Sequence, residues 1–292
     1  MNKRKKNPWP SGRVNTPRRL FPRSSRQAFS LVELLMVIVV GGICMAAAYP
    51  LLWVFFSTFS QNDEYVSAQE NAYNATLALG RVVLLGGLGM PAGSVPSLKG
   101  GSPLSGVVSV NASKDNLTVV WSISTGAMVR TRVESPGAGG KILLSENLLG
   151  RLRVGDVVVF PPTRCFFSVR AVDAAGVTLS PVSGDAAIEQ FSELHQVESS
   201  RFYVNAADHT LRRDDRLGAS NQPLLGGIWG LSVDVMAGGG AVDVTLLGGS
   251  NQVFSRPLAQ EVPGWSPRGL PADNRRFVAI RKIWRVRNWT DK

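Results

Sequence analysis

The first strong pattern along the chain is an uninterrupted apolar run near its N-terminus. From Leu34 to Phe56 there are 23 residues without a charged side chain. As an α-helix rising about 1.5 Å per residue, this run is long enough to cross the roughly 30 Å hydrocarbon core of a bilayer. We therefore predict a membrane-spanning helix over residues 29–56.

The pattern becomes amphipathic after this run. Neither Gly nor Pro occurs between Leu51 and Leu79. Apolar residues recur at spacings of seven, seven, four and seven, on one helical face: Phe59, Val66, Tyr73, Leu77 and Leu84. Polar residues take the other faces, so a continuation of the helix over 57–85 should lie against a folded domain. A glycine cluster followed by Pro91 ends this helix.

Short runs of alternating or β-branched residues, separated by turn residues, fill the remaining stretch, 86–292, which holds 26 of the 30 glycines. The predicted strands are Val107–Val110, Leu117–Ile123, Met128–Val133, Asp156–Phe160, Phe166–Val172, Arg201–Val204, Leu231–Met236, Val242–Leu246 and Phe277–Val286. Parallel pairing would need helices between strands, and none are evident, so we expect antiparallel sheets. The predicted fold is α+β: a long N-terminal helix packed on a C-terminal β-rich head domain, whose division into two sub-modules stays open.

The formal charge of +11 is concentrated at the N-terminus. Residues 1–28 carry nine Lys or Arg and no acid, which leaves 23 basic and 21 acidic residues in the rest of the chain. Basic residues before a span stay on the cytoplasmic side, so everything after Phe56 should be outside the cytoplasm. Cys44 lies within the apolar run, and a disulfide with Cys165 is therefore not expected.

Two kinds of processing fit such an N-terminus. A secretory signal could be cleaved after Ala48, which would release a soluble protein beginning at Tyr49. Against this stands Glu33, an acid at the head of the apolar run. An acidic side chain in a membrane costs about 2.5 to 3.5 kcal/mol, so it usually has a partner and a function. The plain alternative is that Glu33 snorkels to the interface.

The sequence around Glu33 carries a family resemblance. The run Ala28-Phe29-Ser30-Leu31-Val32-Glu33-Leu34-Leu35 resembles the cleavage and N-methylation signal of type IV prepilins and type II secretion pseudopilins. The resemblance implies that a prepilin peptidase cuts between Ala28 and Phe29 and methylates Phe29. It also implies that Glu33, the fifth mature residue, pairs with a neighbouring subunit's amine during filament assembly.

Two further positions match that family. Gly42 and Pro50 become mature positions fourteen and twenty-two, where the family has helix-weakening residues. Pro lacks the amide donor and Gly lowers helix propensity, so we expect local melting or a kink between them. Two features depart from the family pattern. The residue before the cut is Ala28 where Gly is usual, and the leader of 28 residues is longer than most.

The C-terminal half resembles one branch of this family more diffusely. The segments 155–159, 165–169, 201–204 and 211–213 are similar to minor pilins of the PilW type. The segments 230–235 and 277–281 also suit the J-type pseudopilin of type II secretion.

Neither catalysis nor a cofactor is expected. The two histidines, His195 and His209, are fourteen residues apart without companion cysteines, so a zinc site of usual spacing is absent. No Ser, His and Asp arrangement stands out in the sequence. The acids Asp208, Asp214 and Asp215 are predicted to lie in turns, without the spacing of a calcium loop.

The C-terminal run is basic and offers one further candidate site. Arg281, Arg285 and Arg287 alternate with apolar and aromatic residues, which could grip DNA. The alternative is an edge strand whose outward positions are charged to prevent aggregation.

Together these patterns predict a structural subunit, a minor pilin inserted in the inner membrane and then extracted into an extracellular pilus. Its expected partners are prepilin peptidase, other pilins and minor pilins, the inner-membrane assembly platform, the lipid bilayer and, as a weaker candidate, DNA. Roles in DNA uptake, twitching motility or adhesion stay open. The alternatives are a type II secretion pseudopilin and a soluble secreted binding protein.

Overall fold

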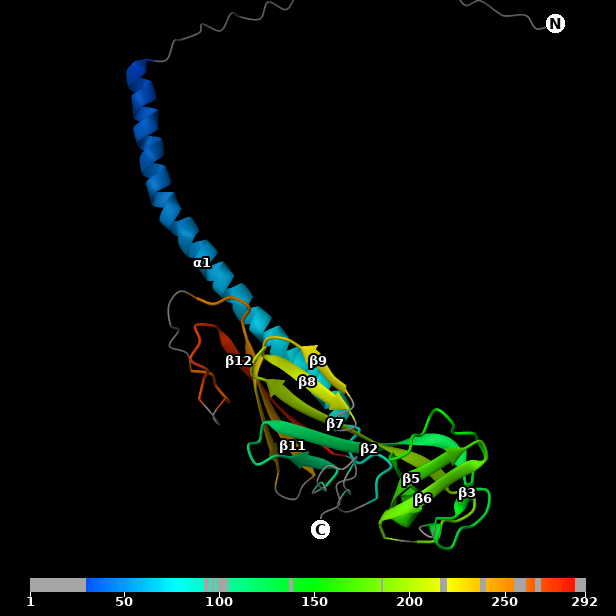
Figure 1. The fold of residues 1–292 in the computed structure, drawn as a ribbon. Helices are drawn as coiled ribbons and strands as arrows, with labels where there is room; N and C mark the ends of the chain where they lie inside the picture. Colours follow the sequence, from blue (N-terminus) through cyan, green and yellow to red (C-terminus); the bar gives the residue numbers. More distant parts are fainter. Residues whose placement is uncertain are drawn as a thin grey trace, which may run out of the picture. The chain divides into compact units, whose positions relative to one another are not determined.

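The structure, a computed structural model, describes residues 30–91, 95, 98, 104, 106–136, 139–184, 186–215, 220–236, 240–254, 261–265 and 269–286. The chain divides into two compact units, residues 1–56 and 57–292. A single helix, α1 (Leu31–Val83), contributes to both units, and antiparallel β-strands follow it (Figure 1). The α+β fold predicted from the sequence is confirmed.

The larger sheet of the second unit has nine strands: β1 (Val108–Val110), β2 (Asn116–Met128), β3 (Lys141–Leu143), β4 (Val157–Val159), β5 (Phe166–Asp173), β6 (Gly176–Ser183), β7 (Glu193–Asn205), β8 (Thr210–Asp215) and β9 (Ser220–Leu225). Their order is β1-β2-β7-β4-β5-β6-β3, and β8 pairs with both β7 and β9. Every pairing is antiparallel. A short 3-10 helix, η2 (Pro161–Thr163), connects β4 to β5.

The smaller sheet has three strands in the order β10-β11-β12. They are β10 (Ile228–Val235), β11 (Ala241–Gly249) and β12 (Phe277–Arg285). The register of β11 and β12 runs without a shift from Ala241 opposite Arg285 to Gly249 opposite Phe277. Because β12 comes last in the strand order, it is an edge strand of this sheet.

The main core of the second unit lies between the end of α1 and both sheets. Leu79, Val82 and Val83 of the helix join a cluster with residues of β2, β7, β10 and β11. Small residues let the helix approach the smaller sheet closely. A side chain at Gly248 would meet the Ala68 carbonyl, so only glycine fits at this crossing.

A second core lies in a separate lobe of the head. Strands β2 and β7 are both 13 residues long and continue from the main core into this lobe, which contains β3, β5 and β6 (Figure 1). Its centre is apolar and fully buried, with Phe160 and Phe167 in edge-to-face contact at 6.0 Å between ring centroids. Cys165 belongs to this cluster, and no disulfide joins it to Cys44.

Most of the predicted strands are present, but the pattern missed or misplaced several. Four strands have no counterpart among the predicted ones: β3, β6, β8 and β9. Residues 128–133 form no strand of their own, since Met128 ends β2 and Val129 and Val133 make only isolated bridges.

The prediction that Asp214 and Asp215 lie in turns is wrong, because both belong to β8. Asp214 is buried and paired with Arg201 of β7 at 2.6 Å, so its charge is compensated within the sheet. Alternation of apolar and polar residues cannot reveal a strand whose buried positions are charged.

Candidate assembly surface

The N-terminal end of α1 is closed by a capping box, a signal that the sequence analysis missed. The Ser30 hydroxyl accepts a hydrogen bond from the Val32 amide at 3.3 Å, and Glu33 Oε2 accepts one from the Ser30 amide at 3.0 Å. This is the S-x-x-E arrangement in which a serine and a glutamate satisfy amides that the first helical turn leaves unpaired. Glu33 therefore has a local partner within its own chain.

This cap does not use all of the acceptor capacity of Glu33. A carboxylate has about four lone-pair sites, and Glu33 is exposed. The positive end of the helix dipole also favours a negative charge at this position. A cationic group from another chain could therefore pair with Glu33 while the cap stays in place. The predicted cleavage residues, Ala28 and Phe29, lie outside the described residues.

The helix continues without a break through the positions predicted to weaken it. Gly42 and Pro50 both lie inside α1. Since Pro50 has no amide hydrogen, the carbonyl four residues earlier loses its helical donor. This is the structure of one chain by itself, and local melting between Gly42 and Pro50 stays a prediction for the assembled state.

The first half of the helix has the properties of a membrane span. By length and composition α1 is the one helix in the described part of the chain that could cross a bilayer. From Leu31 to Phe56 every residue is exposed, including Trp53, Phe55 and Phe56. So much exposed apolar surface needs lipid or other protein to cover it.

The second half of α1 packs on the head, but the apolar stripe of its amphipathic pattern is exposed. Its members are 46 to 64% exposed: Phe59, Val66, Tyr73, Leu77 and Leu84. The face packed on the head is lined mainly by small residues, with Ala68, Ala72, Ala75 and Gly80 buried. At 100° per residue the three alanines lie on the side of the helix opposite the stripe, whereas Gly80 points nearly the same way as the stripe. The five apolar side chains of the stripe therefore do not contribute to the head's own core, unlike Leu79, Val82 and Val83 of the same helix.

Polar residues of the helix hold the loop after β11. Arg276 donates to Gln61 at 3.1 Å, and the buried Glu64 accepts the Gln252 amide at 3.0 Å. Asn251 donates to the Ser67 hydroxyl at 3.2 Å. Gln61, Glu64 and Ser67 recur every three residues, so they follow one another along one face of the helix.

Two of the three basic residues proposed for DNA contact, Arg281 and Arg285, lie on the edge strand β12. Arg281 forms a two-pronged ion pair with Asp243 of β11, and this carboxylate raises the pKa of the Arg281 guanidinium. Arg285 is exposed, and Arg287 lies outside the described residues. Trp284 packs against Gly80 of the helix, with its Nε1 2.9 Å from where a Cβ would be. Its indole is thus engaged within the head.

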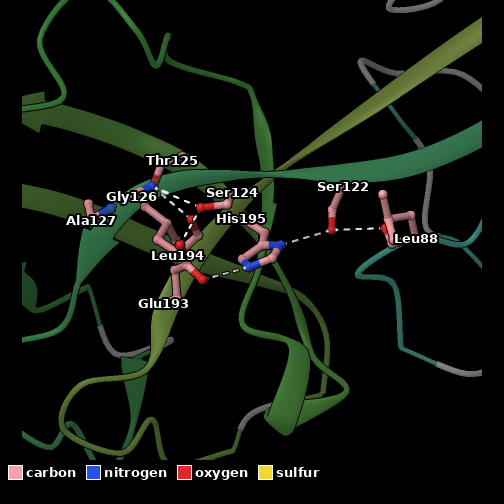
Figure 2. A network of polar contacts seen from close by, with 9 residues as sticks. All are labelled: Leu88, Ser122, Ser124, Thr125, Gly126, Ala127, Glu193, Leu194 and His195. Carbon is pink, nitrogen blue, oxygen red and sulfur yellow. Dashed lines mark hydrogen bonds and ion pairs between the residues drawn. The ribbon is translucent and has the colours of Figure 1, made fainter. Parts of the chain in front are cut away.

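The fold also assembles a polar chain that nothing in the sequence signals, because its members are 73 residues apart. Ser122 of β2 lies between His195 of β7 and the Leu88 carbonyl (Figure 2). His195 Nδ1 is 3.2 Å from Ser122 Oγ, and its Nε2 is 3.3 Å from Glu193 Oε2. The Ser124 hydroxyl lowers the pKa of Glu193 most, and His195 lowers it further, while partial desolvation opposes both.

Serine, histidine and glutamate side chains also occur together in hydrolase active sites, but the surroundings of Ser122 differ from those of a catalytic serine. Ser122 is only 3% exposed, and Gly89 lies directly against its hydroxyl. A nucleophile needs space beside it for the reacting atom. Among the residues that the structure describes, no group of three or more His, Cys, Asp or Glu side chains is placed to hold a metal ion.

Residues 23–49 match the family model of the prokaryotic N-terminal methylation motif. No curated protein and no solved structure matches the chain. The matched segment contains Glu33 and Gly42 and covers the start of the exposed apolar helix. Such a motif implies processing by prepilin peptidase and assembly with other pilins, and it is consistent with an inner-membrane anchor. The motif and the apolar helix together support a type IV pilin-like protein.

Proposed function

We propose that this protein is a minor pilin of the PilW type: a structural subunit, without catalytic activity, that enters or primes a type IV pilus. The observation that carries the proposal is the exposed apolar surface of α1, which does not end at the membrane span. It continues as the stripe from Phe59 to Leu84, on the side of the helix turned away from the head. A membrane anchor alone would need only the first part.

The stripe supports helix packing after the subunit leaves the bilayer. Its seven-residue spacings are those at which helices interdigitate along a shared seam. In the membrane, lipid covers the first half of the helix, and after extraction only other apolar helices can do so. We propose that neighbouring pilin helices cover both halves, with the head outside the cytoplasm and residues 1–28 removed on the cytoplasmic side.

Glu33 would set the stagger between neighbouring helices. Cleavage between Ala28 and Phe29 creates an α-amine about one helical turn from Glu33. The amine of a neighbour can neutralise this carboxylate, and a charge left unpaired in a packed bundle is strongly unfavourable. The register in which the two groups meet is therefore favoured.

The decisive experiment is mass spectrometry of the mature N-terminus, on protein purified from membranes and from sheared filaments. We expect N-methylated Phe29 in both fractions. A mature chain beginning at Tyr49 would mean secretory cleavage after Ala48 and a soluble protein, and it would end the proposal.

A pair of variants separates the charge of Glu33 from its capping role. Glu33→Gln keeps an oxygen that can accept the Ser30 amide but removes the charge, whereas Glu33→Ala removes both. We expect both variants to insert in the membrane and both to be depleted from sheared filaments. Recovery of normal incorporation by Glu33→Gln would show that only the cap matters.

The choice between a pilus and a type II secretion pseudopilus depends on the machine that the subunit joins, since the packing physics is the same. Deleting the gene and counting surface pili, while measuring secreted enzymes in parallel, separates them. We expect fewer pili and unchanged secretion. The opposite result would make the protein a pseudopilin.

A further inference from the structure

A short segment just after α1 is held to the head where β2 and β7 leave the main core for the separate lobe. The Gly87 amide donates to the Val120 carbonyl at 2.9 Å, and the Ser122 amide donates to the Leu88 carbonyl at 2.9 Å. At the same place the Ser122 hydroxyl donates to the Leu88 carbonyl at 3.2 Å and meets the His195 ring (Figure 2). This junction therefore joins three parts of the chain through two backbone bonds and one polar side-chain cluster.

The hydrogen-bond partners of His195 determine how many protons its ring must carry. A carbonyl oxygen only accepts, so the single proton of Ser122 Oγ points to Leu88, and His195 Nδ1 must then donate to Ser122 Oγ. The carboxylate of Glu193 also only accepts, so His195 Nε2 must donate as well. A neutral imidazole carries one proton and can satisfy only one of these two contacts. All three side-chain contacts are made together only when both ring nitrogens are protonated.

We infer that Glu193, His195 and Ser122 form a pH-dependent latch, which fastens the segment after α1 to β2 and β7 when His195 carries both protons. The groups that face the ring are Ser122 from β2, the Leu88–Gly89 backbone from the segment after α1, and Glu193 from β7. On the other side of β7, Val159 of β4 is the register partner of His195 and has no charge. Glu193 is thus the one ionisable neighbour of the ring among these contacts.

The pH window follows from the two ionisable groups. Imidazole rings in general change their charge between about pH 5 and 8, so the two ring protons that the geometry requires are present together only on the acidic side of that range. The pKa of Glu193 is lowered in the fold, so its contribution is present above about pH 4.3 and is lost as pH falls through the lowered value. The latch should therefore be tighter at mildly acidic pH, where Glu193 is still ionised and an imidazole can carry both protons, than at alkaline pH.

Gly89 is part of the latch because of its backbone. It has a φ of +65°, and any side chain there would meet the Ser122 hydroxyl and lie 3.0 Å from His195 Nδ1. Both observations exclude a side chain at this position. Glycine lets the segment lie directly on the Ser122–His195 contact.

Hydrogen–deuterium exchange on the full chain in detergent tests the latch. The readout is the protection of the segments around Gly87 and Ser122, relative to β11 in the same sample, at pH 5.5 and pH 8.0. This reference cancels the chemical pH dependence of exchange. Losing one charge-assisted contact should lower the relative protection about fivefold to tenfold at pH 8.0. His195→Gln should remove this difference, and His209→Gln, at the other histidine, should retain it.

Two outcomes overturn the inference: equal relative protection at both pH values in the wild-type protein, or the same pH dependence in His195→Gln. If His195→Gln does not fold, Ser122→Ala answers the question, because it cuts the link between the ring and Leu88. A pH difference that persists in Ser122→Ala would also overturn the latch. The measurement needs no filament, so its failure leaves the proposed assembly role unaffected.

Discussion

The two halves of α1 share one secondary structure but bury their apolar residues differently. Apart from Glu33, the helix from Leu31 to Phe56 is apolar all round, and it is exposed throughout. From Ser57 to Val83 it has a buried face and an exposed face, and the larger apolar side chains are divided between the two. Leu79 is fully buried while Leu77, two residues earlier, is 46% exposed. Hydrophobicity by itself therefore does not identify the face that packs on the head.

Where the buried face of the helix meets the smaller sheet, its side chains are small. Ala68 and Ala72 lie against Gly248, and Gly80 lies against the Trp284 indole. Small residues let the backbone of α1 approach the backbone of the smaller sheet. Many weak van der Waals contacts at this close crossing then take the place of the contacts that large side chains would make. The large residues of the opposite face then stay available for other chains.

The sharpest test of this comparison is the pair Leu79→Ala and Leu77→Ala. Leu79→Ala should lower the free energy of unfolding of the head by about 2–5 kcal/mol, because it leaves a cavity in the core. Leu77→Ala, at the exposed stripe, should change it by less than about 0.5 kcal/mol. Urea titration of the purified full-length variants in detergent measures both. Similar losses for the two would mean that the stripe also packs on the head.

The second prediction concerns the close crossing of helix and sheet. Gly248→Ala places a methyl group against the Ala68 carbonyl and should destabilise the head by about 1–3 kcal/mol, since two backbones must separate. Gly140→Ala is the matched control, because a Cβ there would have nothing within 4 Å. An unchanged unfolding midpoint for Gly248→Ala would show that the crossing is looser than described.

The third prediction concerns assembly through the exposed stripe. The triple variant Phe59→Ser, Val66→Ser and Leu77→Ser should leave the unfolding midpoint of the head unchanged. Each substitution should weaken subunit packing by about 1 kcal/mol, the scale of a moderate interface contact. The variant should then be present in membranes at the normal level but depleted from sheared filaments. Normal incorporation would confine the assembly surface to residues before Ser57.

The smallest expected effect concerns DNA. Arg281 is already paired with Asp243, so Arg281→Ala should weaken DNA binding by the purified protein by less than about twofold, whereas Arg285→Ala should reduce both the affinity and its salt dependence. Gel-shift titrations at two salt concentrations measure this. If neither variant differs from wild type, β12 is simply a charged edge strand of the smaller sheet.

The sequence predicted the elements that depend on local patterns. The apolar run, the helix stop near Gly86 and strands such as β4, β5 and β12 follow from composition and spacing. It missed strands whose stabilising partners are distant in sequence, such as β8 with its buried Asp214. It also missed the Glu193–His195–Ser122 chain, since side chains 73 residues apart meet only when β2 and β7 pair.

The sequence by itself determined that this chain has a long apolar helix with a single acid near its start, preceded by a basic segment and followed by a β-rich head. These features depend on residue type and spacing alone, because a helix or a span needs no distant partner to be recognised. Only the tertiary structure decided which face of the helix is covered, that Glu64 and Asp214 are buried with partners, and that His195 meets Ser122. Each of these depends on which surfaces fit closely together, and that fit is set by side-chain size and strand register across the whole fold.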